Sequence, residues 1–211
     1  MQRVNALSTF KQMKLLAITL FFALCFSTLS FSPKIQASKK IIIDLQPFDD
    51  LPKEYLNYVH TELKKMYSDV EIKGSIALPK HAWYAPRKRY RADSLISYLS
   101  KRTPVGHLTI GLTTKDISTT NGNIKDWGIM GLGYCPGKSC IASSFRLNKG
   151  NKLLQLFKVS IHELGHTQGI PHCPQKTCYM QDAEGKNKTD TEVGFCDKCK
   201  KVLVKAGWAL K

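Results

Sequence analysis

The sequence has few acidic side chains, no internal repeat and no low-complexity tract. Its 211 residues include 16 Asp and Glu against 32 Lys and Arg, so the formal net charge is +16. The lack of a repeat excludes an array of small structural units. The chain also lacks a linker or a shift in composition, which a second independent core would need. Residues 38–211 are therefore predicted to form one globular domain.

The excess of basic side chains does not identify a partner. A charge of this size can favour nucleic acid, anionic lipid or an acidic substrate. A soluble exported protein tolerates the same charge without any specific partner. Charge alone therefore leaves the class of function open.

One long apolar run stands near the start of the chain. Residues 15–31 are almost wholly apolar; basic residues precede the run and Ile35-Gln36-Ala37 follows it. This order is typical of an export signal with cleavage after Ala37. The alternative is an uncleaved membrane anchor, because 17 residues lie at the short end of what spans a bilayer. We predict a signal peptide at residues 1–37 and a periplasmic or secreted product without a stable membrane anchor.

Three details refine this interpretation. Met13 would make a second suitable start for the signal. A lipoprotein signal is disfavoured because Leu24, just before Cys25, is too large. Cleavage would remove four basic side chains and no acid, which leaves 28 basic against 16 acidic side chains and a net charge of +12.

The hydrophobic pattern after residue 38 alternates between strands and helices. Strands are predicted at 40–45, 70–78, 105–112 and 141–147, with a further one near 127–130, and helices at 52–66, 93–99 and 152–167. Strands separated by helices favour a largely parallel sheet with right-handed crossovers. The segment 113–139 is rich in loop signals. The predicted fold class is therefore α/β.

The helix at 152–167 carries the clearest functional motif. Asn151 is available as its N-cap, and Gly169 and Pro171 end it. Within it, His162 and His166 lie one turn apart on one face, where both imidazoles can reach a single metal ion. A bare HExxH motif also arises by chance among ordinary polar helix residues, so the flanking residues matter.

The residues after this helix supply a third imidazole. Gly169 allows a sharp left-handed turn, and the turn brings His172 back toward the metal. Three neutral imidazoles leave one tetrahedral position for water, whose pKa zinc lowers to about 7. Glu163 is then the predicted general base, which takes a proton from this water and delivers it to the leaving amine.

Four cysteines follow at spacings that suit a closed metal site. Cys173 and Cys178 form one pair, and Cys196 and Cys199 form the second. We predict a structural zinc here, which would make two zinc ions per chain. Because His172 and Cys173 are adjacent, this ion would brace the loop that presents the third imidazole. The alternative is two disulfides, which an exported protein permits.

The string HELGHTQGIPHCPQKTCYM, followed by FCDKC, resembles the signature of the archaemetzincins. Shorter similarities at 82–90, 111–113 and 144–147 extend the resemblance over most of residues 40–205. The loop between Met180 and Cys196 is slightly shorter than the family pattern, which leaves its shape open. The resemblance implies zinc peptidase activity and assigns Met180 to a methionine turn beneath the metal, where it supports the imidazoles without binding the ion.

The same resemblance implies an α/β (α+β) fold, namely a compact metzincin-like domain with a mixed, mostly parallel five-stranded sheet. An antiparallel edge strand near 141–147 would align the substrate, as strand addition allows. The active-site helix and a zinc-braced C-terminal segment complete the predicted domain.

Other polar features receive weaker interpretations. Residues 81–91 (HAWYAPRKRYR) mix basic and aromatic side chains, as nucleic-acid sites do, but they also match family scaffold, and no nucleic acid is expected. Cys135 and Cys140 are candidates for a disulfide at the rim of the cleft. No role is assigned to His60, His81 or His107, which lack metal-ligand spacing.

Three hypotheses about function follow. The first is an exported, monomeric zinc peptidase acting on peptides or proteins. The second is a zinc-stabilised peptide-binding module that is hydrolytically idle, and the third is a disulfide scaffold with one zinc. No propeptide with a cysteine switch is evident between Ala37 and the first predicted strand. The natural substrate and the cleavage specificity are not predicted.

Overall fold

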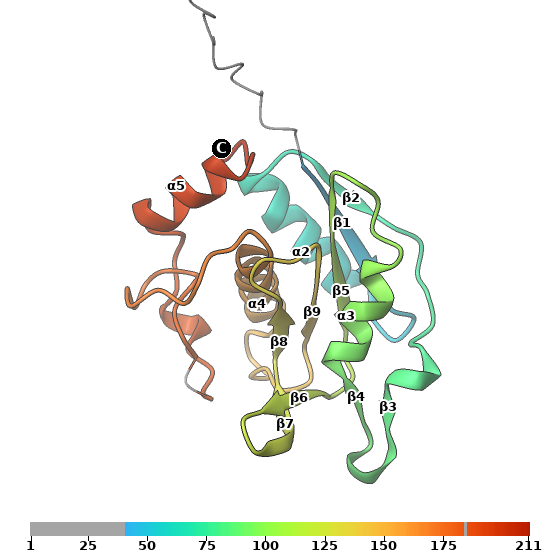
Figure 1. The fold of residues 1–211 in the computed structure, drawn as a ribbon. Helices are drawn as coiled ribbons and strands as arrows, with labels where there is room; N and C mark the ends of the chain where they lie inside the picture. Colours follow the sequence, from blue (N-terminus) through green and yellow to red (C-terminus); the bar gives the residue numbers. More distant parts are fainter. Residues whose placement is uncertain (1–40, 184) are drawn as a thin grey trace, which may run out of the picture. The chain divides into compact units, whose positions relative to one another are not determined.

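A computed structural model describes residues 41–183 and 185–211, and the predicted signal peptide lies outside these residues. The main sheet has five strands in the order β2-β1-β5-β9-β8 (Figure 1). Their bounds are Val70–Ile72, Ile42–Pro47, His107–Thr113, Ser139–Ser143 and Gly131–Gly133, in that order. The first four strands are parallel, and only β8 is antiparallel to its neighbour. The predicted mixed, mostly parallel five-stranded sheet is confirmed.

The identity of the edge strand was predicted wrongly. The segment near Ile141 is not the antiparallel edge, because β9 lies inside the sheet, parallel to β5. The edge is the short strand β8, which pairs Gly131 with Ala142 and Gly133 with Cys140. Glycine-rich strands carry little hydrophobic pattern, so the sequence marked this segment only as a loop.

Helices cover both faces of the main sheet. Helices α2 (Lys53–Met66) and α4 (Lys152–Thr167) pack over one face, and α3 (Ala92–Ser100) packs over the other (Figure 1). Strand β9 serves both layers, since Cys140 and Ala142 face the larger core while Ile141 faces α3. All three helices were predicted within one residue at each end. Asn151 occupies the N-cap of α4, but its side chain makes no capping hydrogen bond.

A second sheet, not predicted as such, has the order β3-β4-β6-β7. Its strands are Trp83–Tyr84, Arg89–Arg91, Ile117–Asn121 and Ile124–Ile129. Two short 3-10 turns, Lys80–Ala82 and Ala85–Arg87, flank β3.

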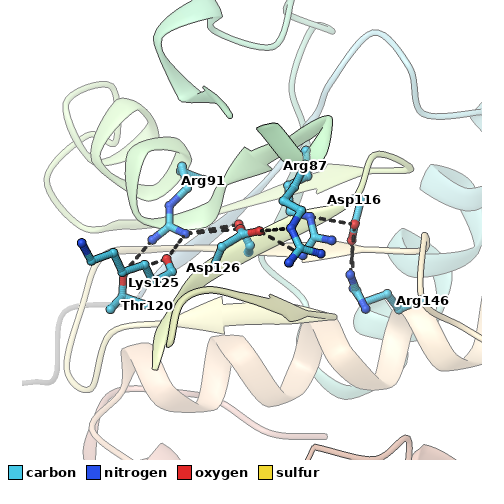
Figure 2. Close-up of polar contacts among 9 residues, drawn as sticks. Arg87, Arg91, Asp116, Thr120, Lys125, Asp126 and Arg146 are labelled. Atoms are coloured by element: carbon cyan, nitrogen blue, oxygen red, sulfur yellow. Dashed lines mark hydrogen bonds and ion pairs between the residues drawn. The ribbon is translucent and has the colours of Figure 1, made fainter. Parts of the chain in front are cut away.

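An ion-pair network joins the strands of this second sheet. Asp126 lies between Arg91 and the pair Arg87 and Arg89, and Asp116 joins Arg89 to Arg146, which it holds through two bonds of 2.8 and 3.0 Å (Figure 2). Arg91 also donates to the Lys125 carbonyl at 2.7 Å and to Thr120 at 2.9 Å. The arginines of the segment once considered for nucleic acid are thus engaged with carboxylates of the same domain.

The C-terminal segment after α4 returns to the main core. It contains a 3-10 turn, Thr189–Thr191, and α5 (Asp197–Lys205). Beyond α5, Trp208 is buried against Tyr67 with ring centroids 5.0 Å apart. Within residues 41–183 and 185–211, no helix has both the length and the apolar character needed to cross a bilayer.

Candidate metal centres and active site

Helix α4 and the turn after it bring three imidazoles together. His162 and His166 lie one turn apart on the helix, with ring centroids 4.6 Å apart. The ring of His172 lies 5.4 Å from that of His162 and 4.9 Å from that of His166. One ring nitrogen of each residue lies within 4.8 Å of those of the other two. This spacing suits a single metal ion held by three nitrogens.

The turn that presents His172 depends on Gly169. Its φ is +81°, in the left-handed region that side chains disfavour. The Gly169 N–H donates to the His166 carbonyl at 2.9 Å, and the Ile170 N–H donates to the Gly165 carbonyl at 3.2 Å. These two bonds close the helix and reverse the chain, as a glycine-capped helix end does. The structure thus adopts the left-handed turn that the sequence predicted at this glycine.

In each of the three imidazole rings, Nδ1 contacts a neighbouring oxygen, and this contact orients the ring. The Nδ1–H of His162 donates to the Tyr179 carbonyl at 2.6 Å, and that of His166 donates to the Ile170 carbonyl at 2.8 Å. The Nδ1 of His172 lies 3.3 Å from a carboxylate oxygen of Asp182. Because a carbonyl only accepts, Nδ1 of the first two rings carries the proton and Nε2 keeps its lone pair. These contacts are the usual support of a metal-binding histidine, so the donor set fits zinc.

Burial favours the neutral imidazoles that a metal needs. It lowers the pKa of His162 to about 3, assisted by His166 and opposed by the Tyr179 carbonyl. Burial also lowers the pKa of His166. Neutral rings at neutral pH are ready to donate a lone pair without first losing a proton.

Glu163 lies beside the imidazoles and is buried from solvent. Burial raises the pKa of its carboxyl to about 8, and a hydrogen bond from the Gly133 backbone lowers it in part. A carboxyl group with its pKa close to neutrality is suited to exchange protons at neutral pH. The hydrogen bond from β8 also fixes the direction of the carboxyl group.

Two glycines of β8 allow the edge strand to lie directly on α4. A Cβ at Gly131 would stand 2.6 Å from Oε1 and 2.7 Å from Cγ of Glu163. A Cβ at Gly133 would stand 2.5 Å from the Glu163 carbonyl oxygen. Both approaches are closer than real Cβ atoms allow. These two residues were not predicted from the sequence, although the repeated glycine in Gly-Leu-Gly is a signal of close backbone approach.

Met180 is fully buried in the core behind helix α4. It packs on α4 at Gly165, where an added Cβ would stand 2.4 Å from the methionine sulfur. Its carbonyl oxygen accepts the Cys173 N–H at 2.7 Å. Met180 therefore connects the active-site helix to the segment that holds the cysteines, and its predicted support of the imidazoles stays a prediction.

The four C-terminal cysteines converge into one cluster. The sulfurs of Cys173, Cys178, Cys196 and Cys199 lie within 4.8 Å of one another. All four are free thiols, and the sulfurs of Cys173 and Cys196 are 3.7 Å apart, far beyond a disulfide bond. Backbone N–H groups of Met180 and Cys196 point at the Cys178 sulfur at 3.5 and 3.4 Å. Four sulfurs in this arrangement could hold zinc in a closed tetrahedral site.

The disulfide suggested between Cys135 and Cys140 is not formed. Both thiols are free, with Cys140 buried on β9 and Cys135 exposed. Pairing of β9 with β8 directs Cys140 into the larger core, away from the exposed loop that carries Cys135. The rim of the cleft is therefore held by strand pairing and not by this bond.

Comparison with known proteins identifies the family of this chain. The model of peptidase family M54 matches residues 36–205. The chain belongs to this family. Family M54 relatives include the archaemetzincin of Haloquadratum walsbyi, 27% identical over 177 residues (77% of this chain and 99% of the relative). The archaemetzincin of Methanopyrus kandleri is 29% identical over 160 residues (74% and 83%).

Solved structures agree with the family assignment. The crystal structure of archaemetzincin from Methanopyrus kandleri has a TM-score of 0.68 and 25% identity, covering 82% of this chain and 98% of its own. The archaemetzincin of Archaeoglobus fulgidus, solved with malonate, shares the fold with a TM-score of 0.66 and 23% identity (77% and 99%). The M54 chain is thus a zinc metallopeptidase that acts on peptide substrates.

A cavity of about 1220 Å³ opens in front of the imidazoles of this M54 peptidase. Strand β8 and the end of β7 form one wall, and residues of the segments 181–183 and 185–192 form another. Two buried charged residues also line it, Lys158 and Glu192. The sequence analysis did not single them out, because Lys158 looked like an ordinary helix residue and Glu192 lies in an irregular loop.

Proposed function

We propose that this peptidase is exported and uses two zinc ions, a catalytic one at His162, His166 and His172 and a structural one at the four-cysteine cluster. The observation that carries the proposal is the convergence of three imidazoles beside a buried carboxyl in one cavity. Zinc, when bound, supplies Lewis acidity that polarises a peptide carbonyl and lowers the pKa of a nearby water.

Glu163 is the residue proposed to move protons. Its carboxylate takes a proton from the attacking water and delivers it to the nitrogen of the leaving amine. The Gly133 N–H holds the carboxylate in place, and the dry surroundings strengthen its interaction with the developing charges. The peptide C–N bond breaks as the amine receives this proton.

Strand β8 is proposed to align the substrate. It stands at the end of the sheet order, so its outer side has no strand partner within the described part of the chain. It also lines the cavity next to the imidazoles. An extended peptide could add there as a further strand, with its backbone hydrogen-bonded to β8. The strand proposed to align the substrate is therefore Gly131–Gly133 and not the segment near Ile141.

Export is proposed from the apolar run at residues 15–31 and its flanking basic residues. The exported protein would then be located in the periplasm or the extracellular space.

The test of the catalytic proposal is Glu163→Gln. The variant should retain its zinc content and lose turnover on a quenched casein or peptide-mixture substrate by about 10²–10⁴-fold, as removal of a general base does. Glu54→Gln, an exposed change on α2, serves as the control and should keep full activity. Equal activity of Glu163→Gln and wild type would refute the role of this carboxyl. A zinc-loaded wild type without turnover would favour the idle binding module.

A further inference from the structure

Lys158 and Glu192 form a pair of buried charged residues inside the catalytic cavity. Their exposed fractions are 7% and 5%, and both line the cavity that contains the three imidazoles. Lys158 lies one turn before His162 on α4, so the two side chains project from the same face of the helix. The pair therefore shares one cavity with the three imidazoles.

The ammonium group of Lys158 is only partly satisfied. Its Nζ donates to the Thr189 carbonyl at 2.6 Å and to the Glu192 carbonyl at 2.7 Å. An ammonium group carries three N–H donors, so among the described residues one donor is left beyond these two bonds. The two bonds fix the group in position, which prevents it from turning out into water.

The carboxyl group of Glu192 has an unused acceptor. Its Oε2 is buried and has no hydrogen-bond partner among the described residues. Burial raises the pKa of this carboxyl to about 7, and Lys158 lowers it in part. A buried oxygen without a donor costs free energy that a ligand can recover.

We propose that Lys158 and Glu192 form a specificity pocket for a carboxamide side chain, Gln or Asn, of the peptide substrate. A carboxamide presents an N–H₂ donor and a carbonyl acceptor at one end. The donor would bond to Oε2 of Glu192 and the acceptor to the remaining N–H of Lys158. An apolar side chain would leave both groups unpaired, and a charged one would meet a like charge from one member of the pair. This inference rests on the proposed function and names its substrate class.

The test is a library of blocked peptides randomised at every position around a central bond. Wild-type, zinc-loaded protein reports preference by cleavage, with products identified by mass spectrometry. The Glu163→Gln variant reports preference by affinity selection, so the pocket can be read even if turnover is absent. We expect enrichment of Gln and Asn at one position in both measurements.

Substitutions of Lys158 and Glu192 test whether the preference for Gln or Asn depends on this pair. Lys158→Met and Glu192→Leu should each lower the ratio of Gln to Leu at that position by about tenfold or more, because a hydrogen-bonding site is replaced by an apolar one. Glu192→Gln keeps an oxygen acceptor and should retain the preference. Lys152→Met, on the same helix but outside the cavity, is the matched control. Circular dichroism and zinc content check that each variant folds. If Lys158→Met does not fold, the Glu192→Leu variant alone tests the proposal.

The outcomes separate the two proposals. An apolar or charged preference, or a Gln preference unchanged in a folded Glu192→Leu variant, overturns the carboxamide pocket and leaves the peptidase proposal standing. Affinity selection of Gln peptides without any cleavage by wild type supports the pocket and removes the catalytic proposal.

Discussion

Glycine at position 131 sets how closely the edge strand approaches Glu163. The strand can lie against the carboxyl group only because no Cβ intervenes there. Several metal-site residues could be predicted from spacing because a helix fixes the distance between side chains four residues apart. Gly131 could not be assigned this way, because its role depends on a strand and a helix that meet only in the folded domain.

Gly131→Ala should lower kcat about tenfold or more while zinc content stays unchanged. The added methyl group would push the Glu163 carboxyl away from its position, and small misplacements of a catalytic group are costly. Measurement of kcat, KM and zinc per chain checks this. Gly150→Ala is the control, since its Cβ would meet no atom within 4 Å. An active Gly131→Ala enzyme would contradict the positioning role of this strand.

Glu192 should make stability depend on pH. Burial raises the pKa of its carboxyl from 4.5 to about 7, so the folded state binds a proton more tightly than the unfolded chain. Its contribution is present below pH 4.5 and is lost as pH rises through 7, with a slope of at most about 1.4 kcal/mol per pH unit. Lys158 and Tyr179 face this carboxyl, and neither residue type normally titrates in that range.

The Glu192→Gln variant lacks this pH-dependent contribution to the free energy of unfolding. The free energy of unfolding, measured with urea from pH 5 to 8, should therefore fall less steeply for the variant than for wild type. Parallel curves for the two proteins would show that the carboxyl is already ionised in the folded state at pH 5.

At the scale of elements, the long helices were predictable and the short strands were not. Helix α4 buries a regular apolar face over 16 residues, so its periodicity outweighs local ambiguity. Strand β8 has three residues and β3 has two, too few for any period. The pairing β4-β6 and the ion pairs of Asp116 and Asp126 depend on contacts between distant segments, which no local pattern records.

The cysteine segment is the element that the proposed structural zinc would hold together. Cys199→Ser should lower zinc from two ions per chain to one, expose the other three cluster thiols to titration, and reduce the affinity of the catalytic site about 10–100-fold, as loss of outer support does. Atomic absorption and thiol titration check this. Cys135→Ser, an exposed thiol outside the cluster, should leave both values unchanged. One zinc and no protected thiols in wild type would contradict the four-sulfur site.

At the scale of the whole molecule, the domain requires only part of the chain. The family match begins at residue 36, close to the predicted cleavage after Ala37. An exported product should therefore begin at Ser38, and intact mass spectrometry of the secreted protein checks this. Ala37→Leu should block cleavage, because a large residue does not suit the small-residue cleavage site. A mature mass that still includes residues 1–37 would contradict the prediction.

His172 and Cys173 are consecutive residues that belong to different candidate metal centres. Mercurials or oxidants that modify the sulfur cluster would loosen the third imidazole without occupying the cavity in front of the imidazoles, which none of the four cysteines lines. The enzyme would then be inactivated by a modification outside its substrate cavity, and a search for inhibitors need not be confined to compounds that compete with peptide.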